Sequence, residues 1–145
     1  MRTRDVFALT LAAALEIEPN DGQALEGRAV ALRVLRRTAE LIPVLEQLAQ
    51  HQPKAARLAT RIELARIHEE HADLASAIAV LARAEAEDGA SGEQSERIDG
   101  WLARERRHEE LEQRLARRAA ATAPGSAAAL SLELRRAAIL ETELG

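Results

Sequence analysis

The chain has 145 residues, of which 47% are apolar but only 1% aromatic, so a core must be built from Leu, Ile, Val and Ala. Such a composition favours closely packed helices over a sheet, which prefers β-branched and aromatic residues. The net charge of −4 argues against a nucleic-acid or anionic-membrane partner, and the absence of cysteine excludes disulfides and thiolate chemistry.

The N-terminal segment is predicted to form a helix over residues 5–18 that ends at Pro19. The alternative is a secretory signal peptide, because a basic start at residues 1–4 precedes a short apolar run. Asp5 interrupts that charge pattern, and the run is too short to span a bilayer. We therefore expect a cytoplasmic protein that does not enter a membrane, with a secreted or periplasmic protein as the alternative.

Two helices are predicted next, over residues 22–36 and from a turn at Arg37-Thr38 to Pro53. Asn20 or Asp21 can cap the first of them. Pro43 lies near the start of the second, so we expect that start to be shifted or slightly kinked. Both helices carry apolar residues at helical spacing, namely Ala24, Leu25, Ala29, Leu32 and Leu35, then Leu41, Ile42, Leu45 and Leu48.

The stretch from Arg61 to Gly89 belongs to the best-formed helical hairpin of the chain. Its first helix is predicted to begin near Ala55, the turn lies at Ala72-Asp73, and Asp73 is placed to cap the second helix. Gly89 is predicted to end that helix, because glycine readily adopts the left-handed conformation found at helix ends. A single hairpin cannot bury both of its apolar faces, so it requires neighbouring helices.

The last third of the chain is predicted to hold a loop or frayed start over residues 90–95 and three further helices. They cover about residues 96–106, 108–122 and 127–144, with Ser126 capping the last one. Trp101 is expected in the core or in an interface, because a Trp side chain buries a large apolar area. The whole chain is then eight helices without a strand.

Helix stops recur at a regular spacing. Pro19, Pro53, Gly89 and Pro124 are separated by 34, 36 and 35 residues, and Arg36-Arg37 with Glu40 recurs as Arg106-Arg107 with Glu110, 70 residues on. The fold predicted is an all-α solenoid of antiparallel helices stacked as helix-turn-helix repeats. It forms a single domain over 1–145, with repeats at 22–53, 55–89 and 94–124 and half-repeats at 5–19 and 126–145.

A two-helix repeat of about 34 residues resembles the tetratricopeptide repeat. The hairpin carries Leu64-Ala65 for the family's large-small pair, Asp73 at the turn, and Ala77-Ile78 and Ala84 in the second helix; residues 14–21 match its repeat end. Arg61 and His68 stand where the family has aromatic residues.

The resemblance implies a protein–protein interaction scaffold rather than an enzyme, with no cofactor and with a protein or peptide partner in a groove lined by the first helices. The Lys/Asn constellation that clamps a peptide carboxylate in some members is not found at these positions. An alternative is a structural segment of a longer array, or a module that self-associates through terminal helices, because Leu130, Leu134 and Leu140 make the last helix apolar. The groove residues implied by position are Gln23, Glu26, Arg33, Arg66, Glu69 and Glu70.

Two patterns have a chemical and a structural interpretation. His68 and His71 lie three residues apart and could share a metal ion, but the spacing differs from HExxH and no third ligand is placed, so a polar helix end is favoured. Arg clusters such as Arg33-Arg36-Arg37 could bind phosphate. Because acidic residues lie among them, intrahelical ion pairs such as Glu110–Arg114 on a solvated face are favoured.

Overall fold

The computed structural model describes Val6, residues 22–89 and residues 91–145. These residues form seven α-helices and no strand, which confirms the prediction of an all-α fold of packed helical hairpins. The helix expected over residues 5–18 falls outside them except for Val6. By its internal contacts the chain divides into two compact units, unit 1 up to Ala90 and unit 2 from Ser91. The single repeat domain over 1–145 stays a prediction.

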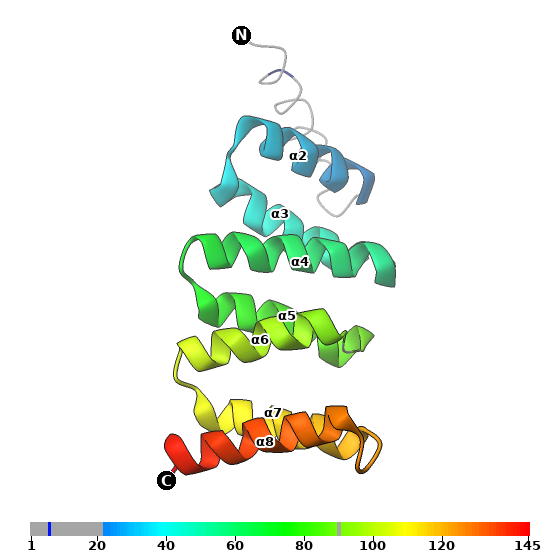
Figure 1. Cartoon of the computed structure of the whole chain (residues 1–145). Coiled ribbons are helices and arrows are strands. Elements are labelled where there is room, and N and C mark those ends of the chain that lie inside the picture. The colour runs from blue at the N-terminus through cyan, green and yellow to red at the C-terminus, as the bar shows by residue number, and fades with distance from the viewer. Residues whose placement is uncertain (1–5, 7–21, 90) are drawn as a thin grey trace. The chain divides into compact units, whose positions relative to one another are not determined.

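Unit 1 contains four described helices, each packed against the next along the chain (Figure 1). They are α2 (Gly22–Leu35), α3 (Thr38–His51), α4 (Lys54–Glu70) and α5 (Leu74–Asp88). A continuous aliphatic core joins α2, α3 and α4, as the composition requires. Its buried members are Leu25, Ala29, Leu32, Leu41, Val44, Leu45, Leu48, Leu64 and Ile67.

Local signals place most helix ends in unit 1 correctly. The Asp73 carboxylate accepts a hydrogen bond from the Ser76 N–H at 3.1 Å and so caps α5, and Gly89 follows α5 with a φ of 92°. Helix α3 begins at Thr38 and runs through Pro43, so its start is not shifted to the proline, and the slight kink expected as the alternative stays a prediction. The exposed position of Pro43 explains why the helix tolerates it, since water can reach the carbonyl left without a donor.

Unit 2 contains α6 (Gly92–Arg104), α7 (His108–Ala121) and α8 (Ala127–Thr142). Helix α6 begins earlier than predicted, because the Ser91 hydroxyl accepts from the Gln94 N–H at 3.4 Å and gives the helix a cap in the expected loop. Ser126 caps α8 as predicted, with its hydroxyl accepting from the Ala129 N–H at 3.1 Å. Trp101 is 3% exposed, which confirms its place in a core.

The three hairpins α2–α3, α4–α5 and α6–α7 share one turn. Its central residue is left-handed in each case: Arg36, Ala72 and Arg106 have φ values of 56°, 57° and 58°. The residue that follows donates its N–H to the carbonyl five residues before it, which closes the helix end in the same way each time. These bonds are Arg37 to Leu32 at 3.0 Å, Asp73 to His68 at 2.9 Å and Arg107 to Leu102 at 2.9 Å.

The shared turn gives the repeats a common register. Eleven residues before the left-handed residue stand Leu25 in α2, Arg61 in α4 and Ser95 in α6, and all three are buried. Seven residues before it stand Ala29, Ala65 and Asp99, again all buried. The repeats therefore keep their geometry while two inward-facing positions change from apolar to charged.

Candidate functional site

The partner-binding residues expected from the resemblance lie on α2 and α4. Gln23, Glu26 and Arg33 on α2 are exposed. Arg66 and Glu70 on α4 are exposed too, and Glu69 beside them is half-buried. By helical geometry each set occupies one side of its helix, opposite the side that enters the core.

An ion pair joins these two sides. The Arg33 guanidinium donates to both carboxylate oxygens of Glu63, with N···O distances of 2.7, 2.8 and 3.0 Å. Because Arg33 is on α2 and Glu63 on α4, the bridge brings the two predicted sets together. Glu63 was not among the expected residues, since its partner lies 30 positions away and leaves no local sign.

Two exposed valines on α2 were also missed by the sequence interpretation. Val30 and Val34 lie one turn apart and are 51% and 50% exposed, so they form an exposed apolar pair on α2. Together with Glu63 and the residues expected from the resemblance, they form a set that has four acidic and two basic members. We use the name first-helix surface for the following residues: Gln23, Glu26, Val30, Arg33 and Val34 of α2, and Glu63, Arg66, Glu69 and Glu70 of α4.

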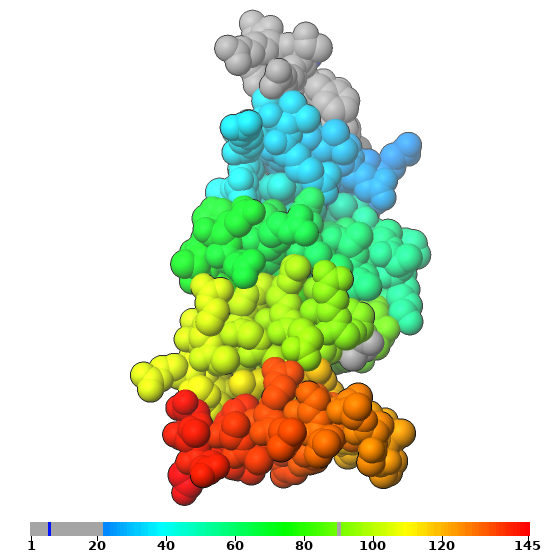
Figure 2. Space-filling view, in the orientation of Figure 1, coloured from blue at the N-terminus to red at the C-terminus, as the bar shows by residue number. Residues whose placement is uncertain are grey.

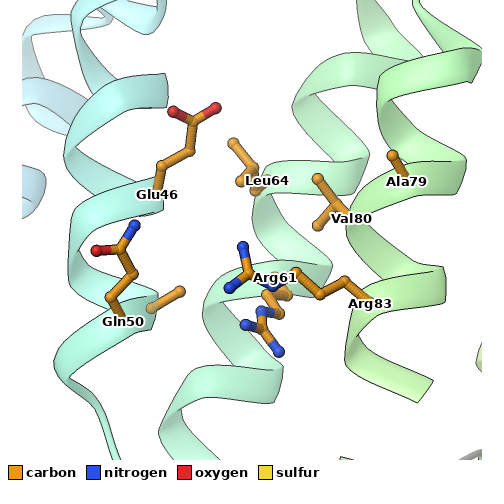
Figure 3. A pocket seen from close by; sticks show the side chains of 8 residues that line it. Glu46, Gln50, Arg61, Leu64, Ala79, Val80 and Arg83 are labelled. Carbon is orange, nitrogen blue, oxygen red and sulfur yellow. The ribbon is translucent and has the colours of Figure 1, made fainter. Parts of the chain in front are cut away.

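A second feature of unit 1 is an open cavity of about 270 Å³ between α3, α4 and α5 (Figure 3). The residues of α4 that line it are Arg61 and Leu64. Around the axis of that helix, Arg66 and Glu70 lie roughly 140° and 180° from Arg61. The cavity is thus on the other side of α4 from the first-helix surface. Its lining residues are Glu46, Ala49, Gln50, Arg61, Leu64, Ala79, Val80 and Arg83. We call it the Arg61 cavity.

A cluster of ion pairs adjoins the Arg61 cavity at the end of α5. Arg61 donates from Nη2 to Glu87 at 2.8 Å, and Arg83 donates from Nε to the other oxygen of Glu87 at 2.7 Å. Arg57 donates to both oxygens of Asp88. Hydrogen bonds from Arg83 and then Arg61 lower the pKa of Glu87, and the bond from Arg57 lowers the pKa of Asp88.

His68 and His71, the pair considered for a metal ion, contact a backbone carbonyl and a carboxylate near the end of α4. The Nδ1 atom of His71 lies 2.7 Å from the Ile67 carbonyl oxygen, and that of His68 lies 3.9 Å from the Asp73 carboxylate. Within the described part of the chain, no group of three His, Cys, Asp or Glu side chains is placed to hold a metal ion.

Members of the Arg clusters are engaged in ion pairs, several of them between helices. Glu110 pairs with Arg107 at 2.7 Å, and Arg114 of α7 reaches Asp99 of α6 at 3.0 Å. Arg118 also binds Asp99, whose side chain is fully buried. The sequence interpretation had these arginines on a solvated helix face and did not anticipate a buried aspartate as their partner.

None of the helices in the described residues is both long enough and apolar enough to cross a membrane. Comparisons with protein-family models, curated proteins and solved structures gave no match to this chain. Function is therefore inferred from the chain's own surfaces.

Proposed function

We propose that this chain is a protein-interaction scaffold of tetratricopeptide-like repeats and that the first-helix surface of unit 1 holds the partner. The observation that carries the proposal is the half-exposed pair Val30 and Val34 beside the Arg33–Glu63 bridge. Exposed apolar side chains rimmed by charged ones are typical of protein contacts. Since acidic residues prevail on this surface, the partner is an amphipathic peptide segment that combines apolar and basic residues.

Selection of peptides from a displayed library on the whole chain tests this proposal. The best peptides are expected to be apolar and basic. They should bind the double variant Val30→Ser/Val34→Ser about tenfold more weakly or worse, because the apolar area of two valines is no longer covered. Isothermal titration calorimetry measures the affinities.

The matched control is Leu130→Ser/Leu134→Ser, which removes an even more exposed apolar pair from α8 and should leave peptide binding unchanged. Charge reversal by Arg66→Glu should strengthen the binding of a basic peptide, because it adds negative charge to the surface. Equal binding to the wild type, the valine variant and the Arg66→Glu variant would move the site away from the first-helix surface.

A second candidate function is self-association through α8. Leu130 and Leu134 are 60% and 63% exposed, and Figure 2 shows one side of α8, in orange to red, uncovered along the helix. In the repeat pattern these residues correspond, 72 positions earlier, to Leu58 and Ile62 of α4, which are half-buried. The open face of α8 is thus of the kind that a neighbouring helix covers in unit 1.

Light scattering over a range of protein concentrations tests the second candidate. Wild-type mass should rise with concentration, whereas Leu130→Ser/Leu134→Ser should stay monomeric because the apolar contact is lost. Here the valine variant Val30→Ser/Val34→Ser is the control. A wild type that remains monomeric at every concentration would remove self-association while leaving the peptide proposal intact.

A further inference from the structure

The Arg61 cavity contains a buried cation that its surroundings leave incompletely bonded. The Arg61 side chain is 5% exposed, yet its Nη1 atom finds no hydrogen-bond acceptor among the described residues. A carboxylate oxygen of Asp88 lies 3.6 Å from Nη1, beyond hydrogen-bond distance. Buried donors of this kind are uncommon in native proteins, and a bound ligand is one established reason for them.

The bonds that hold the two neighbouring carboxylates leave Nη1 of Arg61 without an acceptor among the described residues. Both oxygens of Glu87 are engaged, one by Arg83 and one by Arg61 itself, and both oxygens of Asp88 are engaged by Arg57. Three guanidinium groups therefore share two carboxylates in this cluster. The Nη1 nitrogen of Arg61 is left without a bond, and Arg61 is one of the residues that line the cavity.

Comparison with the first hairpin shows that the fold does not need a cation here. Leu25 occupies the same register position in α2 and is completely buried. A buried charge is costlier than a leucine unless something in the site uses it. The arginine is therefore better explained by a ligand than by the packing of the hairpin.

The remaining cavity wall indicates the chemistry of that ligand. Ala49, Leu64, Ala79 and Val80 form an aliphatic lining, and a volume of about 270 Å³ admits only a small body (Figure 3). Glu46 lines the same cavity, and its negative charge disfavours a dianion such as phosphate. We propose that the Arg61 cavity binds a monoanionic carboxylate carried on a short aliphatic body, with Arg61 as the group that recognises the carboxylate.

Such a carboxylate has two possible sources, a free small carboxylic acid or an acidic side chain of a bound peptide. The whole chain, labelled with ¹⁵N, is titrated with isovalerate while its amide resonances are followed by NMR. Saturable shifts are expected at Gln50, Leu64 and Val80. A blocked tetrapeptide with one glutamate between aliphatic residues is the second probe: tighter binding than isovalerate assigns the peptide source, and weaker binding assigns the free acid.

Variants and an uncharged analogue make the test specific. Arg61→Leu, which introduces the residue found in the first hairpin, should keep the fold and bind isovalerate at least about tenfold more weakly, because a charge-assisted hydrogen bond is lost. Isovaleramide should bind the wild type more weakly by a similar factor. Arg66→Leu removes an exposed arginine from the other side of α4 and should bind isovalerate as the wild type does.

Three results would overturn the proposal: no saturable shift with either carboxylate probe, equal isovalerate binding by Arg61→Leu and wild type, or equal binding of isovalerate and isovaleramide. None of them bears on the first-helix surface, which lies on the other side of α4.

Discussion

Units 1 and 2 place buried ion pairs in the same kind of hairpin, but the cations and the carboxylates have exchanged helices. In α4–α5 the cations Arg57 and Arg61 stand on the first helix and their carboxylates on the second. In α6–α7 the first helix supplies Asp99 and the second supplies the arginines. Since the turns are the same, hairpin geometry does not depend on which helix carries which charge.

The two buried charges also differ in how well they are satisfied. Asp99 receives Arg114 and Arg118 on its two oxygens, and a third guanidinium, that of Arg135, lies 3.9 Å away. Arg61 has one hydrogen-bonded carboxylate and one nitrogen without an acceptor among the described residues. A charge enclosed by its partners has a structural role, whereas an incompletely bonded charge beside a cavity remains available to a ligand.

The largest effect is expected from Asp99→Ala in unit 2. Removing this carboxylate leaves Arg114, whose side chain is 12% exposed, without that buried partner and should lower the free energy of unfolding by about 3–5 kcal/mol. Urea denaturation followed by circular dichroism measures the loss. Glu109→Ala, which removes an exposed acid from α7, is the control and should change little. A loss as small as that of the control would show that the buried Asp99 carboxylate does not stabilise unit 2.

A smaller loss is expected from Arg57→Gln in unit 1, and it should depend on pH. The bond from Arg57 lowers the pKa of Asp88, so this bond stabilises the fold above the ordinary aspartate pKa of 3.8 and is lost as pH falls through the folded value. The stability gap between wild type and variant should be constant from neutral pH to about 5, begin to close below about 4, and disappear as pH falls through the lowered pKa of Asp88.

Urea denaturation at a series of pH values measures that gap. Arg66→Gln, an exposed change on the same helix, should give no gap at any pH. A gap for Arg57→Gln that persists undiminished in acid would mean that Arg57 stabilises the hairpin by packing rather than through the Asp88 carboxylate.

Arg61→Leu should affect stability much less than Asp99→Ala does. Glu87 keeps Arg83 and Asp88 keeps Arg57, while leucine fits a position that Leu25 fills in α2. We expect the free energy of unfolding to change by no more than about 1 kcal/mol in either direction. The same urea experiment measures it. A loss comparable to that of Asp99→Ala would make Arg61 a structural charge and erase the contrast between the units.

Local patterns explain what the sequence could predict. The Ala72-Asp73 turn, the caps at Asp73 and Ser126 and the stop at Gly89 depend on residues a few positions apart, and all are found in the structure. The buried charges were not predicted, because their partners lie far along the chain: Arg57 and Asp88 are 31 residues apart. For the same reason the Arg33–Glu63 bridge and the exposed valines of the candidate site could not be placed.

The smallest effect concerns the turn that the units share. Ala72 in unit 1 and Arg106 in unit 2 both hold a left-handed φ, which costs a residue with a side chain more than it costs glycine. Glycine relieves the cost of the left-handed conformation, while its greater freedom in the unfolded chain offsets part of that gain. We expect Ala72→Gly and Arg106→Gly each to give a net rise of about 0.5–1 kcal/mol in the free energy of unfolding. Thermal and urea denaturation measure both. Ala79→Gly, at an exposed position in the middle of α5, is the matched control and should destabilise by a similar amount. If only one of the two turns gains stability, then the units differ in their turns as well as in their buried charges.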